Sequence, residues 1–571
     1  MIYGDAPFRL ISMRRGYRPE EPLLDGLEEM GGKAHGLLTI QQAIADLSMN
    51  EIVVSIPRMT VLGTSVFDAF MQRNRLWDVA LSDLPDERIA YAFLRGDLPF
   101  EVLGELRALI QEWKTPLAIR SSGLMEDTTR RPFAGVYKTK MIPNNSHDPD
   151  VRFQKLVEAI KYVWASTFFQ IAKDYCRATG LHLGDEKMAV IIQEIVGKRY
   201  HDRFYPELSG VARSFNFYPV SPARPEDGVV SLALGLGKTI VDGGKVWMYS
   251  PAFPQAPPPF KSMQDMLEET QNEFWVVHMG EPPEYNPVKE TEYMRLENLM
   301  TAERDGALKY LVSTYEIESG RLSMGMGARG PRVLTFAPLL VLNEIPFNAM
   351  IRDLLARCEQ VLDGPVEIEF AMTFDPHRLG FLQVRPMMIP GGEMNLSLEE
   401  MHQPDVFLAS ETVLGNGITR EIEDVVYVIP ERFELKNTRQ IADELEKLNR
   451  HLLDEKRPYV LIVFGRLGTL DPWLGIPVTW GQICGARVIV EATLENVRVE
   501  LSQGSHYFHN IINLGILYFC MPYTGAYRVD WEWLKSQPAC YEGEFVRHVR
   551  LPAPLDVRVN GRSRRGVIFK P

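Results

Sequence analysis

Residues 117–139 read LAIRSSGLMEDTTRRPFAGVYKT and carry more information than any other part of the chain. We expect a short apolar strand here that delivers Arg120 into a Ser-Ser-Gly turn. Two carboxylates, Glu126 and Asp127, follow, and the small residues Ala134–Gly135 suggest a hairpin tip. An arginine at a strand end makes forked hydrogen bonds to phosphate, and hydroxyls with backbone N–H groups complete a phosphate cradle. An ordinary strand end fits this segment equally well, so its interpretation depends on other segments.

Two segments with paired glycines suit the same chemistry. Gly31-Gly32-Lys33-Ala34 opens an apolar helical pattern, so backbone N–H groups and Lys33 are able to reach a phosphate. The alternative is a helix-capping turn with a solvated lysine. Gly235 and Gly237 lie in a loop after the apolar run Val229–Leu234, and such a loop is able to close over a triphosphate. Each segment alone is weak evidence.

The most specific chemistry comes from a hairpin predicted at residues 367–386. Alternate residues of a strand share a face, so Glu367 and Glu369 point the same way. Gln383 and Arg385 share a face of the return strand for the same reason. These oxygen ligands suit Mg²⁺ that carries nucleotide phosphates, and an arginine neutralises charge as a phosphoryl group moves. The alternative is a solvated edge hairpin with cross-strand ion pairs.

Together these segments resemble the ATP-binding domain of the pyruvate phosphate dikinase and phosphoenolpyruvate synthase family, which is an ATP-grasp-type fold. The family pattern reads GGKxxxL, VRSS…ED…FAGxxxT, a strand bearing glutamine, SGV, GLGxxxVxG and (D/E)xExA…QxRP, and residues 31–386 contain each in that order. The chain departs from the pattern at Lys238, where an acidic residue is usual, and at Glu367, which replaces aspartate. It also departs after Ser209-Gly210-Val211, which continues into Ala212-Arg213-Ser214.

The resemblance implies a role for each matching residue, with ATP and Mg²⁺ as cofactors. The implied set is Lys33 and Arg120 at the β- and γ-phosphates, Thr139 in the loop over the nucleotide, Gly235 and Gly237 in the glycine loop, Gln193 and Glu194 at the adenine and ribose edge, Glu369 and Gln383 at Mg²⁺ with Glu367 beside them, and Arg385 at the γ-phosphate. Arg120 and Arg385 are therefore the implied catalytic residues of this domain.

Composition agrees with a large enzyme and excludes several other classes. The 571 residues suffice for two or three domains, and a net charge of −13 argues against general nucleic-acid binding. The five cysteines are scattered without a CxxC pair, which fits a reducing cytoplasm and argues against a zinc module. The apolar runs are too short to span a bilayer, and the start lacks the apolar segment of an export signal. We therefore expect a cytoplasmic protein that binds neither nucleic acid nor membrane.

We expect a mixed α+β and α/β chain with three segments. Residues 1–28 form a leader, residues 29–392 an ATP-grasp-type domain, and residues 405–571 a smaller α/β domain. In the smaller domain, residues 439–452 have the apolar spacing of an amphipathic helix. After residue 400 about 170 residues remain, too few for a (β/α)₈ barrel, which needs about 250.

A histidine in the smaller domain extends the resemblance. In the family, the ATP-binding domain phosphorylates a histidine on a swivelling domain, which carries the phosphoryl group to a distant acceptor site. Ser505-His506 stands eight residues before Leu514-Gly515-Ile516, as in the family's histidine motif. Neutral imidazole is nucleophilic near pH 7, so His506 is the candidate phosphocarrier. The alternative is a capping or buried histidine in a domain that kept the fold and lost the chemistry.

Three functions fit these observations. The first is a dikinase-type phosphotransferase that moves a phosphoryl group from Mg-ATP to His506 or to an acceptor. The second is a direct ATP-grasp kinase or ligase without phosphohistidine, and the third is a non-catalytic ATP-binding regulatory module. The intact set of Arg120, Glu369, Gln383 and Arg385 argues against the third. The acceptor stays open between a small molecule, a glycan and a partner protein, including a separate subunit that carries the acceptor site.

Overall fold

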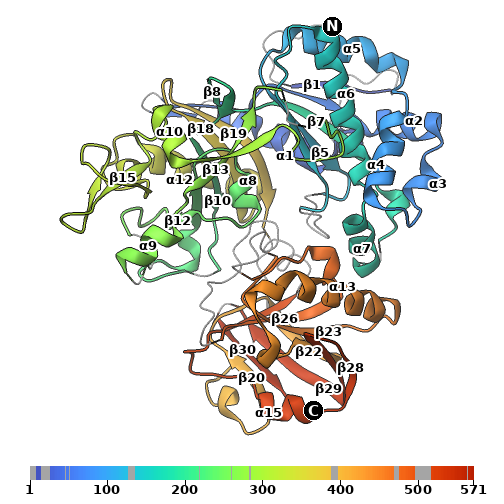
Figure 1. Ribbon diagram of the computed structural model, residues 1–571, viewed down its shortest axis with the longest axis vertical. Coiled ribbons are helices and arrows are strands. Elements are labelled where there is room, and N and C mark those ends of the chain that lie inside the picture. The colour runs from blue at the N-terminus through green and yellow to red at the C-terminus, as the bar shows by residue number, and fades with distance from the viewer. Residues whose placement is uncertain are drawn as a thin grey trace.

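The computed structural model shows a mixed α/β protein built from several sheets and helices (Figure 1). The described residues are 8–13, 26–45, 47–49, 52–126, 135–179, 181–217, 219–256, 258, 260, 262–281, 284–387, 396–468, 475–494, 516–561 and 563–571. Asp127, Ala134, His506 and most of the expected leader lie outside these ranges. Among the described helices, none is both long enough and apolar enough to cross a membrane.

The first lobe, in blue and cyan in Figure 1, is a five-stranded sheet with helices packed against it. The sheet order is β1 (Phe8–Ile11), β4 (Met59–Leu62), β7 (Met188–Glu194), β5 (Leu117–Gly123) and β6 (Thr139–Ile142). The helices are α2 (Thr64–Asn74), α3 (Trp77–Ala80), α4 (Asp86–Arg95), α5 (Phe100–Glu112), α6 (Pro149–Ser166) and α7 (Gln170–Thr179). An aromatic cluster that includes Phe67, Phe70 and Trp164 fills the space between helices and sheet. The predicted strand therefore exists as β5, in the interior of the sheet.

The second lobe is built on a seven-stranded sheet. Its order is β12 (Trp247–Tyr249), β11 (Val229–Ala233), β10 (Leu208–Arg213), β18 (Val366–Thr373), β19 (Arg378–Pro386), β3 (Ile52–Ser55) and β2 (Ser48–Met49). The predicted hairpin is confirmed, because β18 and β19 pair antiparallel with Glu367 opposite Arg385 and Glu369 opposite Gln383. Apolar residues of one face pack on α1 (Gly26–Ala45) and α12 (Phe347–Leu362). The hairpin's charged residues lie on the opposite face, so the core of this lobe leaves them available to a site.

Smaller elements complete the second lobe. A four-stranded sheet has the order β14 (Met294–Asn298), β13 (Glu273–His278), β9 (Arg203–Tyr205) and β8 (Lys198–Tyr200), and a three-stranded sheet has the order β16 (Arg321–Met324), β15 (Val312–Glu316) and β17 (Arg332–Leu334). The short helices are α8 (Lys238–Val241), α9 (Met263–Glu269), α10 (Leu299–Arg304) and α11 (Ala337–Leu340).

The third lobe, in orange and red in Figure 1, contains a nine-stranded sheet. Its order is β20 (Val406–Ser410), β30 (Arg565–Phe569), β29 (Val546–Asn560), β22 (Asn416–Val428), β23 (Tyr459–Phe464), β26 (Ala486–Ala492), β27 (Leu517–Met521) and β21 (Val413–Leu414), with β28 (Ala539–Glu542) paired to β29; a separate pair is β24 (Arg466–Leu467) with β25 (Gly475–Ile476). The strands β22, β23, β26 and β27 run parallel. The helices are α13 (Thr438–Asp454), which confirms the predicted amphipathic helix, and α15 (Trp531–Ser536).

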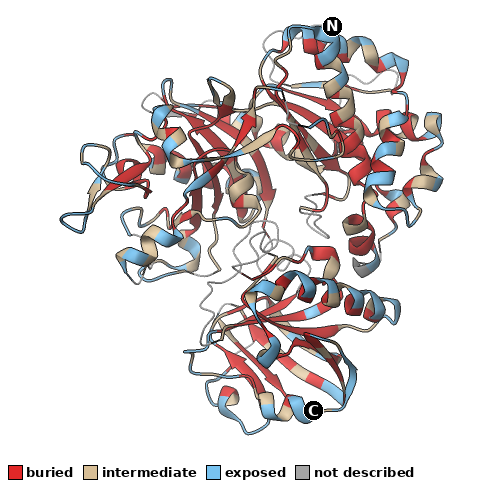
Figure 2. Ribbon diagram, in the orientation of Figure 1, coloured by how far each residue is buried: buried red, intermediate tan, exposed pale blue. Residues whose placement is uncertain are grey.

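The first and third lobes contact each other through α7. The turn Trp480–Gln482 of the third lobe packs on this helix, and Gly481 approaches it so closely that an added Cβ would lie 3.3 Å from the Ile171 Cα. Each lobe keeps its own buried strands, as the red ribbons in Figure 2 show. The third lobe therefore packs on the first lobe without adding a strand to the five-stranded or the seven-stranded sheet.

Candidate functional site

A break in α1 places Lys33 against β5. Gly31 has φ 72°, and an added Cβ would lie 1.9 Å from the Ser122 carbonyl oxygen, so only glycine fits this approach. The Ser122 hydroxyl donates to the Met30 carbonyl at 2.7 Å and accepts from the Ala34 N–H at 3.1 Å. The two glycines of the sequence motif thus join the helix to the strand that carries Arg120.

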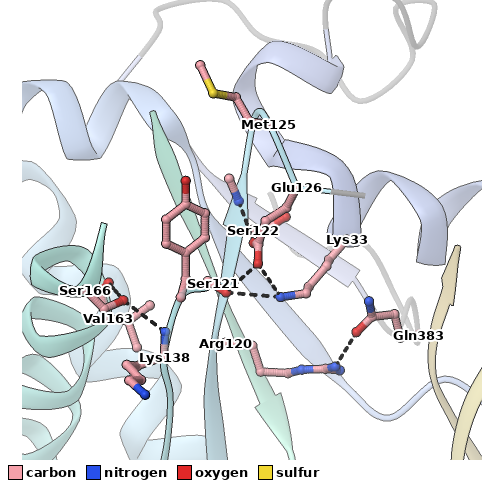
Figure 3. Close-up of polar contacts among 12 residues, drawn as sticks. Lys33, Arg120, Ser121, Ser122, Met125, Glu126, Lys138, Val163, Ser166 and Gln383 are labelled. Carbon is pink, nitrogen blue, oxygen red and sulfur yellow. Dashed lines mark hydrogen bonds and ion pairs between the residues drawn. The ribbon is translucent and has the colours of Figure 1, made fainter. Parts of the chain in front are cut away.

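Lys33 is held by a buried carboxylate. Its Nζ lies 2.7 Å from Glu126 Oε1 and 3.1 Å from the Ser121 hydroxyl (Figure 3). Glu126 also accepts from the Gly123 N–H at 2.9 Å, and its side chain is 1% exposed, against 15% for Lys33. The carboxylate and the turn therefore fix the ammonium at the edge of the site, where it retains contact with solvent.

Arg120 joins the two sheets. One guanidinium nitrogen donates to the Leu382 carbonyl at 2.7 Å and to Gln193 Oε1 at 3.2 Å. The other donates to Gln383 Oε1 at 2.8 Å and lies 3.4 Å from Glu369 Oε2. Figure 3 shows Arg120 extended toward Gln383, on the same side of β5 as Lys33. The structure thus brings together Arg120, Gln193, Glu369 and Gln383, although Arg120 and Gln383 are 263 residues apart in the sequence.

The open end of the hairpin, where β18 begins and β19 ends, forms a buried ion cluster. One oxygen of Glu367 accepts from Arg213 Nε at 2.5 Å, and the other accepts from Arg385. Glu367 and Arg385 are 1% and 2% exposed. The strand register explains the cluster, since Glu367 pairs with Arg213 on one side and with Arg385 on the other. Glu367 therefore has both oxygens engaged by arginines, whereas within the described part of the chain the Glu369 carboxylate makes only the 3.4 Å contact to Arg120.

The donor set fits a metal ion that a nucleotide brings with it. Among the described residues, no three His, Cys, Asp or Glu side chains gather closely enough to hold a metal ion by themselves. Glu369 and Gln383 offer two oxygens on adjacent strands, and Mg²⁺ commonly takes one or two protein oxygens together with phosphate oxygens. Gln193 Nε2 adds a donor, because it is buried and has no hydrogen-bond partner within the described part of the chain. The site thus contains oxygen ligands for a cation and an N–H group for an acceptor on a ligand.

Other predicted residues lie around this centre. Thr139 pairs with Arg120 across β5 and β6. Glu194 accepts from Arg58 at 2.8 and 2.7 Å and from the Thr115 hydroxyl at 2.5 Å, and its hydrogen bond raises the pKa of Arg58. Because Glu194 follows Gln193 in a strand, it faces away from Arg120. Its predicted role at the nucleotide stays a prediction.

The glycine loop follows β11 as expected. Gly235 has φ 81°, and its carbonyl accepts from the Ser209 hydroxyl at 2.6 Å. Gly237 immediately precedes α8, and Lys238 of that helix pairs with Asp242 at 2.9 Å. The lysine that departs from the family pattern is therefore paired with the aspartate that directly follows its own helix.

Sequence reasoning missed Glu186 and Tyr137. Glu186 has no exposed surface and accepts from the Leu124 N–H at 2.8 Å and the Tyr137 hydroxyl at 2.8 Å. Burial raises the pKa of Glu186 to about 7. Glu186 is 62 residues from the turn that it supports, and no local motif connects them. Glu186 reaches this turn because β5 pairs with β7. The pairing ends with Gly123 opposite Met188, two residues from Glu186 in the sequence.

The remaining predicted residue is His506, which lies outside the described residues. Its assignment as a phosphocarrier stays a prediction from sequence spacing. The same holds for Asp127 in the turn after β5.

The chain is similar in sequence to a known protein family and to individual known proteins. The family model described as "Pyruvate phosphate dikinase, AMP/ATP-binding domain" matches residues 27–406. A phosphoenolpyruvate synthase of Aeropyrum pernix is 28% identical over 237 residues, covering 39% of this chain and 26% of that protein. A rifampicin phosphotransferase of Streptomyces sviceus is 27% identical over 205 residues, covering 33% of this chain and 22% of that protein.

These matches agree with the geometry and with the resemblance stated from sequence. The aligned parts make up about a quarter of each curated relative. The family model, in contrast, spans the cradle at Lys33, the strand of Arg120 and the whole hairpin that ends at Pro386. The chain therefore belongs to the family of the pyruvate phosphate dikinase AMP/ATP-binding domain.

Proposed function

We propose that this protein is an ATP-dependent phosphotransferase that binds Mg-ATP between the five-stranded and seven-stranded sheets, in an ATP-grasp-type arrangement. The observation that carries the proposal is the position of Arg120. Its guanidinium reaches from β5 to Gln193, Glu369 and Gln383 on three other strands. The names of the two relatives, a synthase and a phosphotransferase, support the same reaction class.

When ATP binds, its phosphate oxygens would replace the protein oxygens that now accept hydrogen bonds from Arg120 and Lys33. Arg120 and Lys33 each contact protein oxygens with some solvent exposure, 13% and 15% of the side chain. An arginine donates two parallel hydrogen bonds to a phosphate, so the β- and γ-phosphates would gain both charge and orientation here. Gln193 Nε2 would donate to the nucleotide, and this removes the cost of a buried donor without a partner.

Glu369 and Gln383 would hold the magnesium ion. The bound ion would neutralise charge on the phosphate oxygens. Release from Arg120 would free the oxygens of both side chains for this task. Arg385 would act from the neighbouring register position, where Glu367 fixes its orientation at the edge of the phosphates. We assign Glu367 to this positioning role because both of its oxygens already contact arginines.

His506 is the first candidate acceptor. An imidazole nitrogen would form a bond to phosphorus as the phosphoryl group leaves its bridging oxygen, and the nucleotide would leave with the bonding electron pair. The argument rests on the spacing between His506 and Leu514-Gly515-Ile516. Direct transfer to a small molecule is the second candidate.

The first experiment incubates the protein with magnesium and γ- or β-labelled ATP, then treats it with acid or base. A protein-bound label that is acid-labile and base-stable, and that His506→Ala abolishes while His509→Ala retains, establishes a phosphohistidine. Nucleotide turnover without such a label indicates direct transfer. If the wild-type chain neither binds nor turns over Mg-ATP, the proposed function is wrong.

A further inference from the structure

A buried carboxyl group lies against the turn at residues 123–126. Glu186 has no exposed surface, and its Oε1 accepts from the N–H groups of Leu124 at 2.8 Å and Met125 at 3.4 Å. Its Oε2 accepts from the Tyr137 hydroxyl at 2.8 Å. The approach depends on Gly123, because an added Cβ there would lie 2.9 Å from Glu186 Oε1. The turn after β5 therefore packs directly on an ionisable group.

The same turn carries the carboxylate that holds Lys33. The Gly123 N–H donates to Glu126 Oε2 at 2.9 Å, and Glu126 Oε1 lies 2.7 Å from Lys33 Nζ. Figure 3 shows Met125 and Glu126 on this turn, with Glu126 directed at Lys33. Three consecutive N–H groups thus donate to two carboxyl groups, Glu126 and Glu186. A shift of the turn away from Glu186 would move Glu126 and, with it, the ammonium that we assign to phosphate.

Glu186 is the group of this cluster whose charge changes near neutral pH. Burial raises the pKa of Glu186 to about 7, and the charge of Glu126 adds to the rise. The ionisable neighbours in the described part of the chain are Glu126 on the turn, Tyr137 before β6, Cys176 on α7 and Lys187, which follows Glu186. Burial raises the pKa of Tyr137 well above its ordinary value and that of Cys176 to about 12, so both stay neutral. The Lys187 ammonium pairs with Asp68 instead.

We propose that Glu186 is a positioning residue for the phosphates of ATP, and that binding of Mg-ATP is coupled to uptake of a proton at Glu186. The proposal rests on the proposed function, because it assigns Lys33 to the phosphates. When Lys33 turns from Glu126 to the phosphate oxygens, Glu126 loses its cation and the negative charge next to Glu186 increases. An ionised Glu186 is then disfavoured, so its carboxylate takes a proton from the solvent. By linkage, ionisation of Glu186 weakens ATP binding by the same free energy.

The test measures the Mg-ATP affinity of the full chain by calorimetry between about pH 6 and about pH 8.5, on both sides of the Glu186 titration. Buffers with different enthalpies of ionisation count the protons taken up on binding. Glu186→Gln keeps an oxygen that accepts from the turn and stays uncharged, so it mimics the protonated acid. Tyr137→Phe removes a hydrogen bond that lowers the pKa of Glu186. Glu101→Gln is the matched control, because Glu101 is an exposed glutamate of the same lobe.

We expect the wild type and Glu101→Gln to bind Mg-ATP at least about threefold more weakly at the upper end of this range than at the lower end. Both should take up protons near pH 7. Glu186→Gln should show neither effect, and Tyr137→Phe should move the midpoint of the affinity profile to higher pH. Protons that ATP itself binds are common to all the proteins and cancel in the comparison.

Glu186→Ala separates positioning from charge. It removes the acceptor of two N–H groups, so Mg-ATP affinity should fall at least about tenfold at every pH, whereas Glu186→Gln restores it. Wild-type affinity in Glu186→Ala overturns the positioning role. Equal proton uptake by the wild type and Glu186→Gln, or an unchanged midpoint in Tyr137→Phe, overturns the coupling. These outcomes leave the proposed function standing, whereas a wild type that binds no Mg-ATP removes the function itself.

Discussion

Two arginine–carboxylate clusters in this protein are built in opposite ways. On the hairpin face, the single guanidinium of Arg120 serves acceptors from three strands, and its side chain is 13% exposed. In the third lobe, the single carboxylate of Asp424 accepts from Arg457 at 2.6 Å, His548 at 2.7 Å and Arg550 at 3.0 Å. Asp424 is 1% exposed. In the Arg120 cluster, several acceptors surround one guanidinium group. In the Asp424 cluster, several donors surround one carboxylate.

The difference separates a binding arrangement from a structural one. Phosphate oxygens are able to displace neutral or distant acceptors from an arginine, because the charged hydrogen bond to phosphate is stronger. A buried carboxylate that already satisfies three donors offers no place for an incoming anion. We therefore expect changes in the Asp424 cluster to act on stability and changes in the Arg120 cluster to act on catalysis.

Asp424→Ala tests the structural side and should have the largest effect. Removal of the carboxylate takes away the acceptor that the buried His548 shares with Arg457 and Arg550, which keep only their contacts to Glu423 and Glu455. We expect a loss of about 3–5 kcal/mol in unfolding free energy. Urea unfolding, together with hydrogen exchange of the β22 amides, measures this loss of stability. The control is Asp443→Ala, because Asp443 is exposed. Affinity for Mg-ATP should stay unchanged. A large loss of nucleotide affinity without loss of stability would contradict the comparison.

The same cluster predicts a response to acid. Burial alone would raise the pKa of Asp424, but hydrogen bonds from His548, Arg550 and Arg457 lower it to about 2. Because the folded-state pKa lies below the ordinary value of about 3.9, the cluster contributes fully above that value. Its contribution is then lost as the pH falls toward 2. Asp424→Ala should abolish this part of the acid dependence.

Arg120→Ala tests the catalytic side. Loss of the guanidinium should lower the rate of phosphoryl transfer by about 10²–10³-fold, since it would act on charge that develops in the transition state. Arg107→Ala is the matched control, because Arg107 is an exposed arginine of the same lobe that pairs with Asp150. The measurement is single-turnover transfer from labelled ATP. Normal turnover by Arg120→Ala, with the fold intact by circular dichroism, would show that the site is assigned wrongly.

The sequence predicts the local strands and helices of this site better than it predicts which distant residues contact their side chains. The strand of Arg120, the hairpin and the helix at 439–452 follow from short-range patterns of two and 3.6 residues, and each exists in the structure. Family membership follows from the order of the short motifs between residues 31 and 386, and the family model confirms it. The residues that satisfy each side chain do not follow, because Glu186 meets the turn at Leu124 only through sheet pairing.

The two glutamates of the hairpin illustrate the same limit. The alternation that predicts a common face for Glu367 and Glu369 holds, yet their environments differ. Arg213, on a third strand, engages Glu367 and has no counterpart beside Glu369, where Val211 occupies the paired position. A pattern of alternation within one hairpin contains no information on this neighbour. The structure is therefore needed to separate a positioning carboxylate from a candidate metal ligand.

Glu186 offers a pH test of the turn beside Arg120. Burial raises the pKa of Glu186 to about 7, above the ordinary glutamate value of about 4.3. The folded state then binds a proton more tightly than the unfolded state, so stability relative to Glu186→Gln should fall as the pH rises from about 4.3 to 7. We expect a change of about 3.5 kcal/mol across this window and none above it. A pH-independent difference between wild type and variant would contradict the proton uptake.

Glu369→Gln tests the smallest and most specific effect, on the cation. The amide keeps the size of the side chain and the oxygen that faces Arg120 but removes the negative charge that would attract Mg²⁺. We expect Mg-ATP affinity to fall by about 1.5–3 kcal/mol, roughly ten- to hundredfold, while affinity for ATP in excess chelator stays unchanged. Titration of both forms measures this, with exposed Glu273→Gln as control. An equal loss of ATP affinity with and without magnesium would mean that Glu369 acts on Arg120 rather than on the ion. Gln383 and the phosphates would then have to hold the cation without a protein carboxylate.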